Sequence, residues 1–229
     1  MRWLHRLREL PGLILLNWLN HFWNLWLWLA EMRAFYGNPA LRRADWLWMR
    51  SYGLQSPFDL SRRALQAGQL SEDLSIYGET PWTTLQRIAV AAELQPGSQV
   101  IDLGCGTGRT LLFFYYALGC PVRGYELVPE FVSRFEALKV RLGLKESVQL
   151  YAQNWFEADL RDGDFLLLVG TCYSDVHLQQ ACRSLGQLRS GAVVASISYA
   201  LESPDFELLQ RFEAPFSWGR ATVFLQRRI

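Results

Sequence analysis

The sequence predicts an α/β fold with a mostly parallel sheet that ends in an antiparallel hairpin. From residue 82 onward, apolar runs typical of buried strands alternate with segments of helical pattern. A glycine-rich turn at 104–108 follows the first apolar run, and Glu126 ends the second. In open α/β sheets, a glycine turn with an acid about 20 residues later holds a nucleotide at the carboxyl ends of the strands. That edge of the sheet is therefore the expected ligand site.

Composition and charge limit the class of protein. A chain of 229 residues can bury one α/β core with some chain left over. Its 23 basic and 22 acidic residues give a net charge of +1, so the charge balance predicts no nucleic-acid partner. The four cysteines lack metal-ligand spacing, which is typical of reduced thiols in a domain on the cytosolic side of the membrane, and no metal site is expected.

Residues 1–30 are predicted to form a Trp-rich hydrophobic helix. Leu13–Ala30 is a run of 18 residues without formal charge, and a helix of that length spans about 27 Å, close to the ~30 Å of a hydrocarbon core. Tryptophan is enriched at membrane interfaces, and this run holds four: Trp18, Trp23, Trp26 and Trp28. These features predict a membrane-associated protein with a transmembrane helix, and with its folded domain on the cytoplasmic side.

Polar side chains leave two other interpretations of this helix open. Four of them fall on one helical face: Asn17, Asn20, His21 and Asn24. A polar stripe is costly in hydrocarbon unless it meets another helix or water. The alternatives are therefore a helix in the plane of the membrane surface, and a helix packed on the protein or in an oligomer interface.

Residues 31–75 carry turn signals between short helical patterns, including Gly37–Asn38–Pro39 and Ser56–Pro57. We expect a helical linker that packs on the following domain and partly covers its ligand site as a lid. An interaction arm is the alternative. The folded domain itself is expected at 76–229.

The glycine turn favours one class of nucleotide over another. Val100–Leu103 is an expected strand, and Gly104, Gly106 and Gly108 lead into an expected helix at 111–118. Asp102 lies near the strand end, where its carboxylate can brace the turn or accept from a cationic ligand. The dinucleotide fingerprint G-x-G-x-x-G requires a glycine at 109, where this chain has a bulky cation, Arg109, in the place of a redox cofactor's diphosphate. The spacing therefore argues against NAD and FAD.

The string D-L-G-C-G-T-G at 102–108, with Glu126 at the end of the expected second strand at 121–125, resembles the first two motifs of the class I S-adenosylmethionine (SAM) methyltransferases. The resemblance implies a Rossmann-like sheet with SAM as the cofactor. It also implies that the loop containing Gly104, Gly106 and Gly108 passes under the methionine part of SAM, and that Glu126 holds the ribose.

Two short motifs resemble narrower groups. Y-G-E-T-P at Tyr77–Pro81, ahead of an expected helix at 82–94, is similar to the non-SET histone-lysine methyltransferases. G-Y-E-L-x-P at 124–129 resembles the membrane-anchored lysine methyltransferases of the ATP-synthase c subunit. The first resemblance implies that Tyr77, Glu79 and Thr80 form a lid over SAM. The alternative is an ordinary turn in which Thr80 caps the helix.

Further site residues are expected where the later strands end. An expected helix at 129–142 and strand at 148–153 precede Asn154 and Trp155, which by the resemblance meet the adenine edge and ring, with Phe156 as a second candidate for the ring. The strand expected at 164–170 ends before Thr171 and Tyr173, which we expect to contact the methyl acceptor. A packing role for Tyr173 is the alternative.

The C-terminal part predicts an unusual connection. After a helix at 176–188 and a strand at 191–199, only about six residues precede the strand expected at 206–213, and a last strand is expected at 221–227. That gap is too short for the helix that most class I methyltransferases place there, and the lysine-methylating groups also lack it.

The sequence thus predicts a SAM-dependent methyltransferase, and more narrowly a membrane-associated protein-lysine N-methyltransferase. The expected partner is a protein substrate, which includes membrane proteins, or a small molecule. Two alternatives remain at this point. One is a small-molecule or lipid methyltransferase, and the other is a non-catalytic SAM-binding interaction protein.

Overall fold

The computed structural model describes residues 2–68 and 77–229, and the side chains of residues 2–15 and 17 fall outside that description. Its α-helices are α1 (Arg2–Phe35), α2 (Pro39–Tyr52), α3 (Pro57–Gln66), α5 (Trp82–Ala91), α6 (Arg109–Leu118), α7 (Pro129–Leu142) and α8 (Asp175–Leu185), and η1 (Trp155–Glu157) is a 3-10 turn. Its strands are β1 (Val100–Leu103), β2 (Val122–Glu126), β3 (Val148–Ala152), β4 (Phe165–Leu168), β5 (Val193–Ile197), β6 (Phe206–Phe216) and β7 (Gly219–Arg228).

One seven-stranded sheet runs in the order β3-β2-β1-β4-β5-β7-β6. The first five strands are parallel, and β7 lies antiparallel to both β5 and β6. This confirms the predicted Rossmann-like sheet with an antiparallel C-terminal hairpin. No helix lies between β5 and β6, as the short gap predicted. Every helix and strand expected from residue 82 onward is present, with ends shifted by at most three residues.

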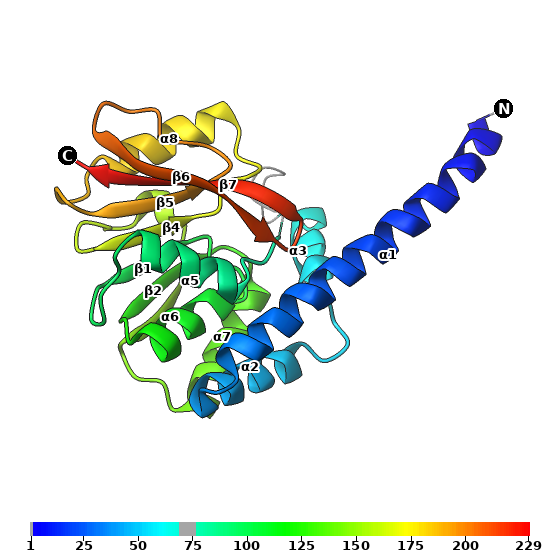
Figure 1. Ribbon diagram of the computed structural model, residues 1–229, viewed down its shortest axis with the longest axis horizontal. Helices are drawn as coiled ribbons and strands as arrows, with labels where there is room; N and C mark the ends of the chain where they lie inside the picture. The colour runs from blue at the N-terminus through cyan, green and yellow to red at the C-terminus, as the bar shows by residue number, and fades with distance from the viewer. Residues whose placement is uncertain (1, 69–76) are drawn as a thin grey trace.

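Two apolar layers hold the sheet between helices. On one face, buried side chains of α5, α6 and α7 pack against alternate sheet residues that include Val100 and Val122. On the other face, α8 packs through Ala181 and Leu185 on residues that include Ile101 and Leu166. Figure 1 shows this layered domain, with α2 beside α6 and α7. The carboxyl ends of β1, β2 and β4 stay free of these helices, which leaves room for a ligand.

The first helix has two differently placed halves. α1 extends from the body of the molecule at its N-terminal end and packs on it at its C-terminal end (Figure 1). There Leu27 and Glu31 are buried, Trp23 Nε1 donates to the carbonyl of Phe216 at 2.7 Å, and Asn24 Nδ2 donates to that of Ser217 at 3.1 Å. One face of the predicted hydrophobic helix therefore contacts the turn between β6 and β7.

The expectation of a transmembrane helix is not supported. Among the residues that the structure describes, no helix combines the length and the apolar character needed to cross a membrane. The uncharged run at 13–30 contains asparagines, and the side-chain amide of Asn24 donates a hydrogen bond to the backbone carbonyl of Ser217. α1 also continues without a break through residue 30, so the predicted boundary there falls inside one helix. Residues 69–75 of the predicted linker, and residue 76, lie outside the described residues.

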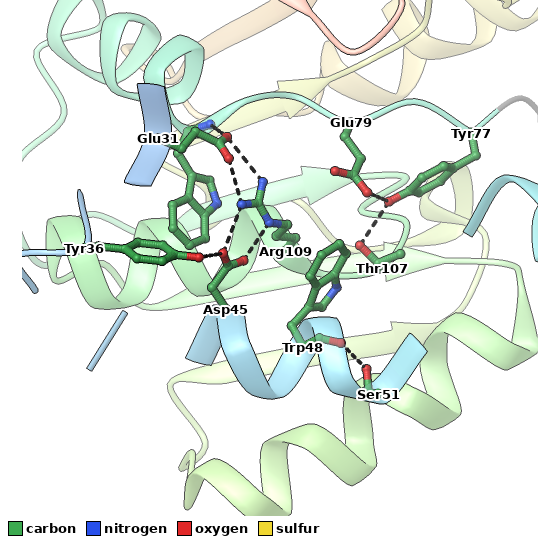
Figure 2. A network of polar contacts seen from close by, with 10 residues as sticks. Glu31, Tyr36, Asp45, Trp48, Ser51, Tyr77, Glu79, Thr107 and Arg109 are labelled. Atoms are coloured by element: carbon green, nitrogen blue, oxygen red, sulfur yellow. Dashed lines mark hydrogen bonds and ion pairs between the residues drawn. The ribbon is translucent and has the colours of Figure 1, made fainter. Parts of the chain in front are cut away.

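A buried ionic network ties the N-terminal helices to the sheet domain (Figure 2). Arg109, the first residue of α6, donates through Nη2 to Glu31 of α1 and through Nε to Asp45 of α2, both at 2.8 Å. All three side chains are at least nine-tenths buried. The guanidinium also lies over the ring of Trp82, 4.2 Å from its centroid. The charge of Arg109 is therefore neutralised by two carboxylates of the protein itself.

Candidate functional site

A cavity of about 300 Å³ lies at the carboxyl ends of β1, β2 and β4. It brings together almost every site residue predicted from the sequence. Those that line it are Tyr77, Glu79, Thr80, Asp102, Gly104, Gly106, Glu126, Asn154, Trp155, Thr171 and Tyr173. Residues that lie up to 96 positions apart in the chain thus share one cavity, whose size suits a ligand of nucleoside dimensions.

The glycine loop requires glycine for two different reasons. Gly106 and Gly108 have φ of +55° and +75°, a left-handed conformation that side chains disfavour. A Cβ on Gly106 would lie 2.9 Å from the Tyr77 ring, and one on Gly108 only 2.4 Å from the Phe135 ring. Gly108 is the one predicted site residue that does not line the cavity. Its small size serves the packing of α7 against α6.

Glu126 holds the loop in place through backbone bonds. Its Oε2 accepts from the N–H of Gly106 at 2.8 Å, and its Oε1 accepts from the N–H groups of Leu127 and Val128 at 2.8 and 2.7 Å. Burial raises the pKa of this carboxyl, and the three backbone donors oppose that shift. A carboxylate offers about four acceptor positions. The Glu126 carboxylate can therefore accept one more hydrogen bond, from a hydroxyl group of a ligand. Ribose binding by Glu126 stays a prediction.

Asp102 is a second buried carboxyl at the cavity wall. It is 2% exposed, and it accepts a hydrogen bond from the Thr110 hydroxyl on α6. Burial is the main cause that raises the pKa of Asp102 to about 7, while the bond from Thr110 acts in the opposite direction. The carboxylate thus braces the turn, and a cation in the cavity would favour its ionised form.

The segment at 77–81 forms the part of the cavity wall that meets the glycine loop. The Tyr77 hydroxyl donates to Glu79 Oε1 at 2.9 Å and lies 3.2 Å from Thr107 Oγ1, so it links this segment to the loop (Figure 2). Burial raises the pKa of Glu79, although the charge of Arg109 opposes the shift. The alternative in which Thr80 caps α5 was wrong. Pro81 is the residue that caps α5, and no side chain of the segment bonds to the helix end.

Aromatic side chains form the wall beyond β3 and β4. Asn154 Oδ1 accepts from the N–H of Phe156 at 3.1 Å, so the side chain that was expected at the adenine edge also shapes η1. Trp155 is buried, and its Nε1 donates to the Tyr173 hydroxyl at 3.2 Å. Phe156 packs on Trp155 with 4.1 Å between ring centroids. Both rings line the cavity, and the choice between them as adenine partner stays open.

Thr171 and Tyr173 follow β4, where the methyl acceptor was expected. Thr171 Oγ1 accepts from the Ser198 hydroxyl at 3.1 Å, and the Tyr173 hydroxyl retains its own proton to donate. Burial raises the pKa of Tyr173 to about 12, so this phenol stays neutral at physiological pH. These side chains present neutral hydroxyl groups, and their contact with an acceptor stays a prediction.

The charges around the cavity favour a cation. Three carboxyl side chains line it, from Glu79, Asp102 and Glu126. Within the described part of the chain, Arg109 is the one basic side chain on this wall, and two carboxylates neutralise it. A diphosphate would meet net negative charge here, whereas the sulfonium and ammonium groups of SAM would be attracted. The residues therefore fit SAM.

Sequence reasoning missed several residues of this site. Trp218, in the turn between β6 and β7, lines the cavity, and a Cβ added to Gly78 would lie 2.4 Å from its ring. Thr107 and Thr110 bond to Tyr77 and Asp102. The position of the two threonines in the sequence could have indicated their role, because Thr107 lies inside the glycine loop and Thr110 lies two residues after it. No local signal connects Gly78 with Trp218, which lie on different elements 140 positions apart.

Comparison with known proteins agrees with this geometry. The family model for the histone methylation protein DOT1 matches residues 69–168. Among curated proteins, the ribosomal protein L11 methyltransferase of Thermus thermophilus is 33% identical over 106 residues, which is 46% of this chain. The match spans 40% of that relative's length.

Solved structures give the same fold. An RNA methyltransferase from Salinibacter ruber in complex with S-adenosylhomocysteine (SAH) matches with a TM-score of 0.55 and 21% identity, over 65% of this chain and 92% of that one. TrmN from Thermus thermophilus matches with a TM-score of 0.55 and 17% identity, over 74% of this chain and 52% of that one.

The chain therefore has the fold of the class I SAM-dependent methyltransferases, and SAM is the cofactor that the comparisons support. The expected exclusion of nucleic-acid partners is not supported, because a structure of the same fold is an RNA methyltransferase.

The Glu126→Gln variant tests ribose binding. We expect its affinity for SAH to fall about tenfold to a hundredfold, because a hydrogen bond to a charged group contributes about 1.5–3 kcal/mol. Isothermal titration calorimetry measures the affinity, with the exposed Glu146→Gln substitution as the matched control. If Glu126→Gln unfolds at the temperature of the wild type and binds SAH equally well, the carboxylate does not hold the ribose.

Asp102 predicts a pH dependence of SAM binding. Because a bound cation lowers the pKa of Asp102 from about 7, the ionised form binds SAM more tightly. The affinity should therefore rise about tenfold from about pH 6 to about pH 8. Asp102→Asn should remove this rise, apart from the part due to the amino group of SAM itself. An equal pH profile in the variant would show that Asp102 does not sense the cation.

Proposed function

We propose that this class I methyltransferase fold serves a protein-lysine N-methyltransferase that works at a membrane surface. The observation that carries the proposal is the cavity itself, which joins a carboxyl-lined cofactor wall to an end formed by Phe156, Thr171 and Tyr173. An amine acceptor needs such an end, because it must lose its proton and be aimed at the methyl group.

The comparisons support a protein acceptor. The matching family model is named for histone methylation, and the curated relative is named for methylation of a ribosomal protein. The family model covers both Tyr77–Pro81 and the glycine loop. The lysine preference rests on the YGETP and GYELVP motifs and on the chemistry below.

In this proposal the residues of the cavity orient the lysine amine and remove it from water. A lysine amine has a pKa of about 10.4 and is protonated at neutral pH. When bound, SAM supplies an electrophilic methyl group on a positively charged sulfonium. Burial of the amine beside a positive charge lowers its pKa and releases the nucleophilic lone pair. The hydroxyl groups of Thr171 and Tyr173 then accept N–H bonds from the neutral amine and aim its lone pair.

Transfer of label from radioactive SAM tests this proposal. Membranes and soluble proteins from the source cells are incubated with the protein, and label is measured in protein, lipid and RNA fractions. We expect label on lysine in a protein. Label confined to lipid, to RNA or to small molecules would contradict the proposal, as would tight SAM binding without any transfer.

The Tyr173→Phe variant separates aiming from cofactor binding in the same assay. Its rate of methyl transfer should fall about fivefold to tenfold, as expected for one lost hydrogen bond of about 1–1.5 kcal/mol, while its affinity for SAH stays unchanged. Tyr151→Phe is the matched control, because Tyr151 is exposed on β3.

Membrane association rests on the outward face of α1. Spacings of three and four residues place six apolar side chains on the face opposite Leu27 and Glu31, and each is at least 48% exposed: Trp18, Leu19, Phe22, Leu25, Trp26 and Leu29. A helix with this pattern lies in the interface of a bilayer with its apolar face in the acyl boundary. The cytoplasmic leaflet is the side where SAM is available to the domain.

Vesicle binding tests this placement. Replacing Phe22 and Trp26 with serine should weaken binding to phosphatidylcholine–phosphatidylglycerol vesicles at least about tenfold, because burial of each large apolar side chain contributes about 1.5–3 kcal/mol. The control carries serine at Leu54 and Val140, which are exposed outside α1. Equal sedimentation of both variants with vesicles would contradict the membrane role of α1.

A further inference from the structure

Glu31 joins two walls of the cofactor cavity without lining it. Its Oε1 accepts from the backbone N–H of Trp82 at 2.6 Å, and its Oε2 accepts from Arg109 Nη2 at 2.8 Å. Trp82 is the first residue of α5 and directly follows the wall segment at 77–81. Arg109 is the first residue of α6 and directly follows the glycine loop. One carboxylate on α1 therefore contacts the starting point of both helices that flank the cavity.

The end of α5 depends on this contact. No acidic residue stands in its first turn, and its own N-cap makes no side-chain bond. Glu31 supplies from another helix the negative charge and the acceptor that a helix N-terminus favours. The walls themselves meet at Tyr77, whose hydroxyl lies 3.2 Å from Thr107 Oγ1. A shift of α5 would therefore move Tyr77 against the glycine loop.

Asp45 provides a natural comparison. It is also buried and also pairs with Arg109, at 2.8 Å through Nε. Its other contact is the Tyr36 hydroxyl at 2.7 Å, and Tyr36 does not line the cavity. Loss of either carboxylate removes the same charge from the same guanidinium, but only Glu31 reaches α5.

We propose that Glu31 is a positioning residue for the SAM cavity, so that cofactor affinity depends on how α1 is seated. This proposal rests on the proposed function for its ligand. Glu31 sets the distance between the wall segment at 77–81 and the glycine loop, whereas Asp45 neutralises Arg109 without contacting α5.

Paired Glu31→Gln and Asp45→Asn variants test the proposal in the full-length protein. Glu31→Gln should raise the dissociation constant for SAH at least tenfold, and Asp45→Asn less than threefold, although the two variants lose similar thermal stability. In ligand-free protein, hydrogen exchange at the amides of Glu79 and Gly106 should be faster in Glu31→Gln only. Neither amide bonds to Glu31, because they donate to Ser217 and Glu126.

Equal SAH affinities and equal exchange in the two variants would overturn the proposal. If Glu31→Gln does not fold, Glu31→Asp keeps the charge but is one methylene too short to hold both partners, and it should show the same tenfold loss. If the wild-type protein binds neither SAM nor SAH, the proposed function fails. The exchange comparison then still decides whether Glu31 positions the cavity walls.

Discussion

The buried charge of Arg109 is the constraint on which the arrangement of this protein depends. A guanidinium cannot be left unpaired inside a protein, and removal of one partner of such a buried pair typically costs about 3–5 kcal/mol. The two carboxylates that neutralise it come from α1 and α2, which otherwise contact the domain mainly through apolar side chains. Burial lowers the pKa of Arg109, but the charges of Glu31 and Asp45 raise it well above its ordinary value. The N-terminal helices are thus fixed to the helix that follows the glycine loop.

The same pairing sets the electrostatics of the cavity. Because Glu31 and Asp45 pair with Arg109, and also raise the pKa of Glu79 against the lowering effect of the arginine, Arg109 only partly offsets the carboxyl groups of the cavity wall. Burial raises the pKa of each of these three groups, Glu79, Asp102 and Glu126, because it disfavours the charged form. A cationic ligand relieves that cost, and an anionic one increases it. Selection for a sulfonium over a diphosphate therefore follows from the neutralisation of one arginine as well as from the spacing of glycines.

Local features of the sequence predicted most of the sheet domain and of the cavity wall. The glycine loop and Glu126 carry their signals within short stretches, and both lie where the pattern placed them. Arg109 shows the limit of such reasoning. The residue was noticed, but its partners stand 78 and 64 positions away, and no local spacing connects them. The uncharged run in α1 was likewise interpreted as membrane-spanning, because a sequence does not reveal that Asn24 and Trp23 bond to the turn between β6 and β7.

One face of α1 is exposed and apolar, and the opposite face packs on the protein. Trp26 lies on its exposed apolar face, and Glu31 follows five residues later on its buried face, about 7.5 Å along the axis. If the outward face binds a membrane and the inward face positions the cofactor cavity, the two equilibria share one element. Linkage then requires reciprocity: whatever factor a bound membrane applies to SAM affinity, bound SAM applies to membrane affinity. A helix that only anchored the protein through a mobile linker would transmit no such factor. The ionic contact of Glu31 with Arg109 is what makes α1 part of the folded core of the protein.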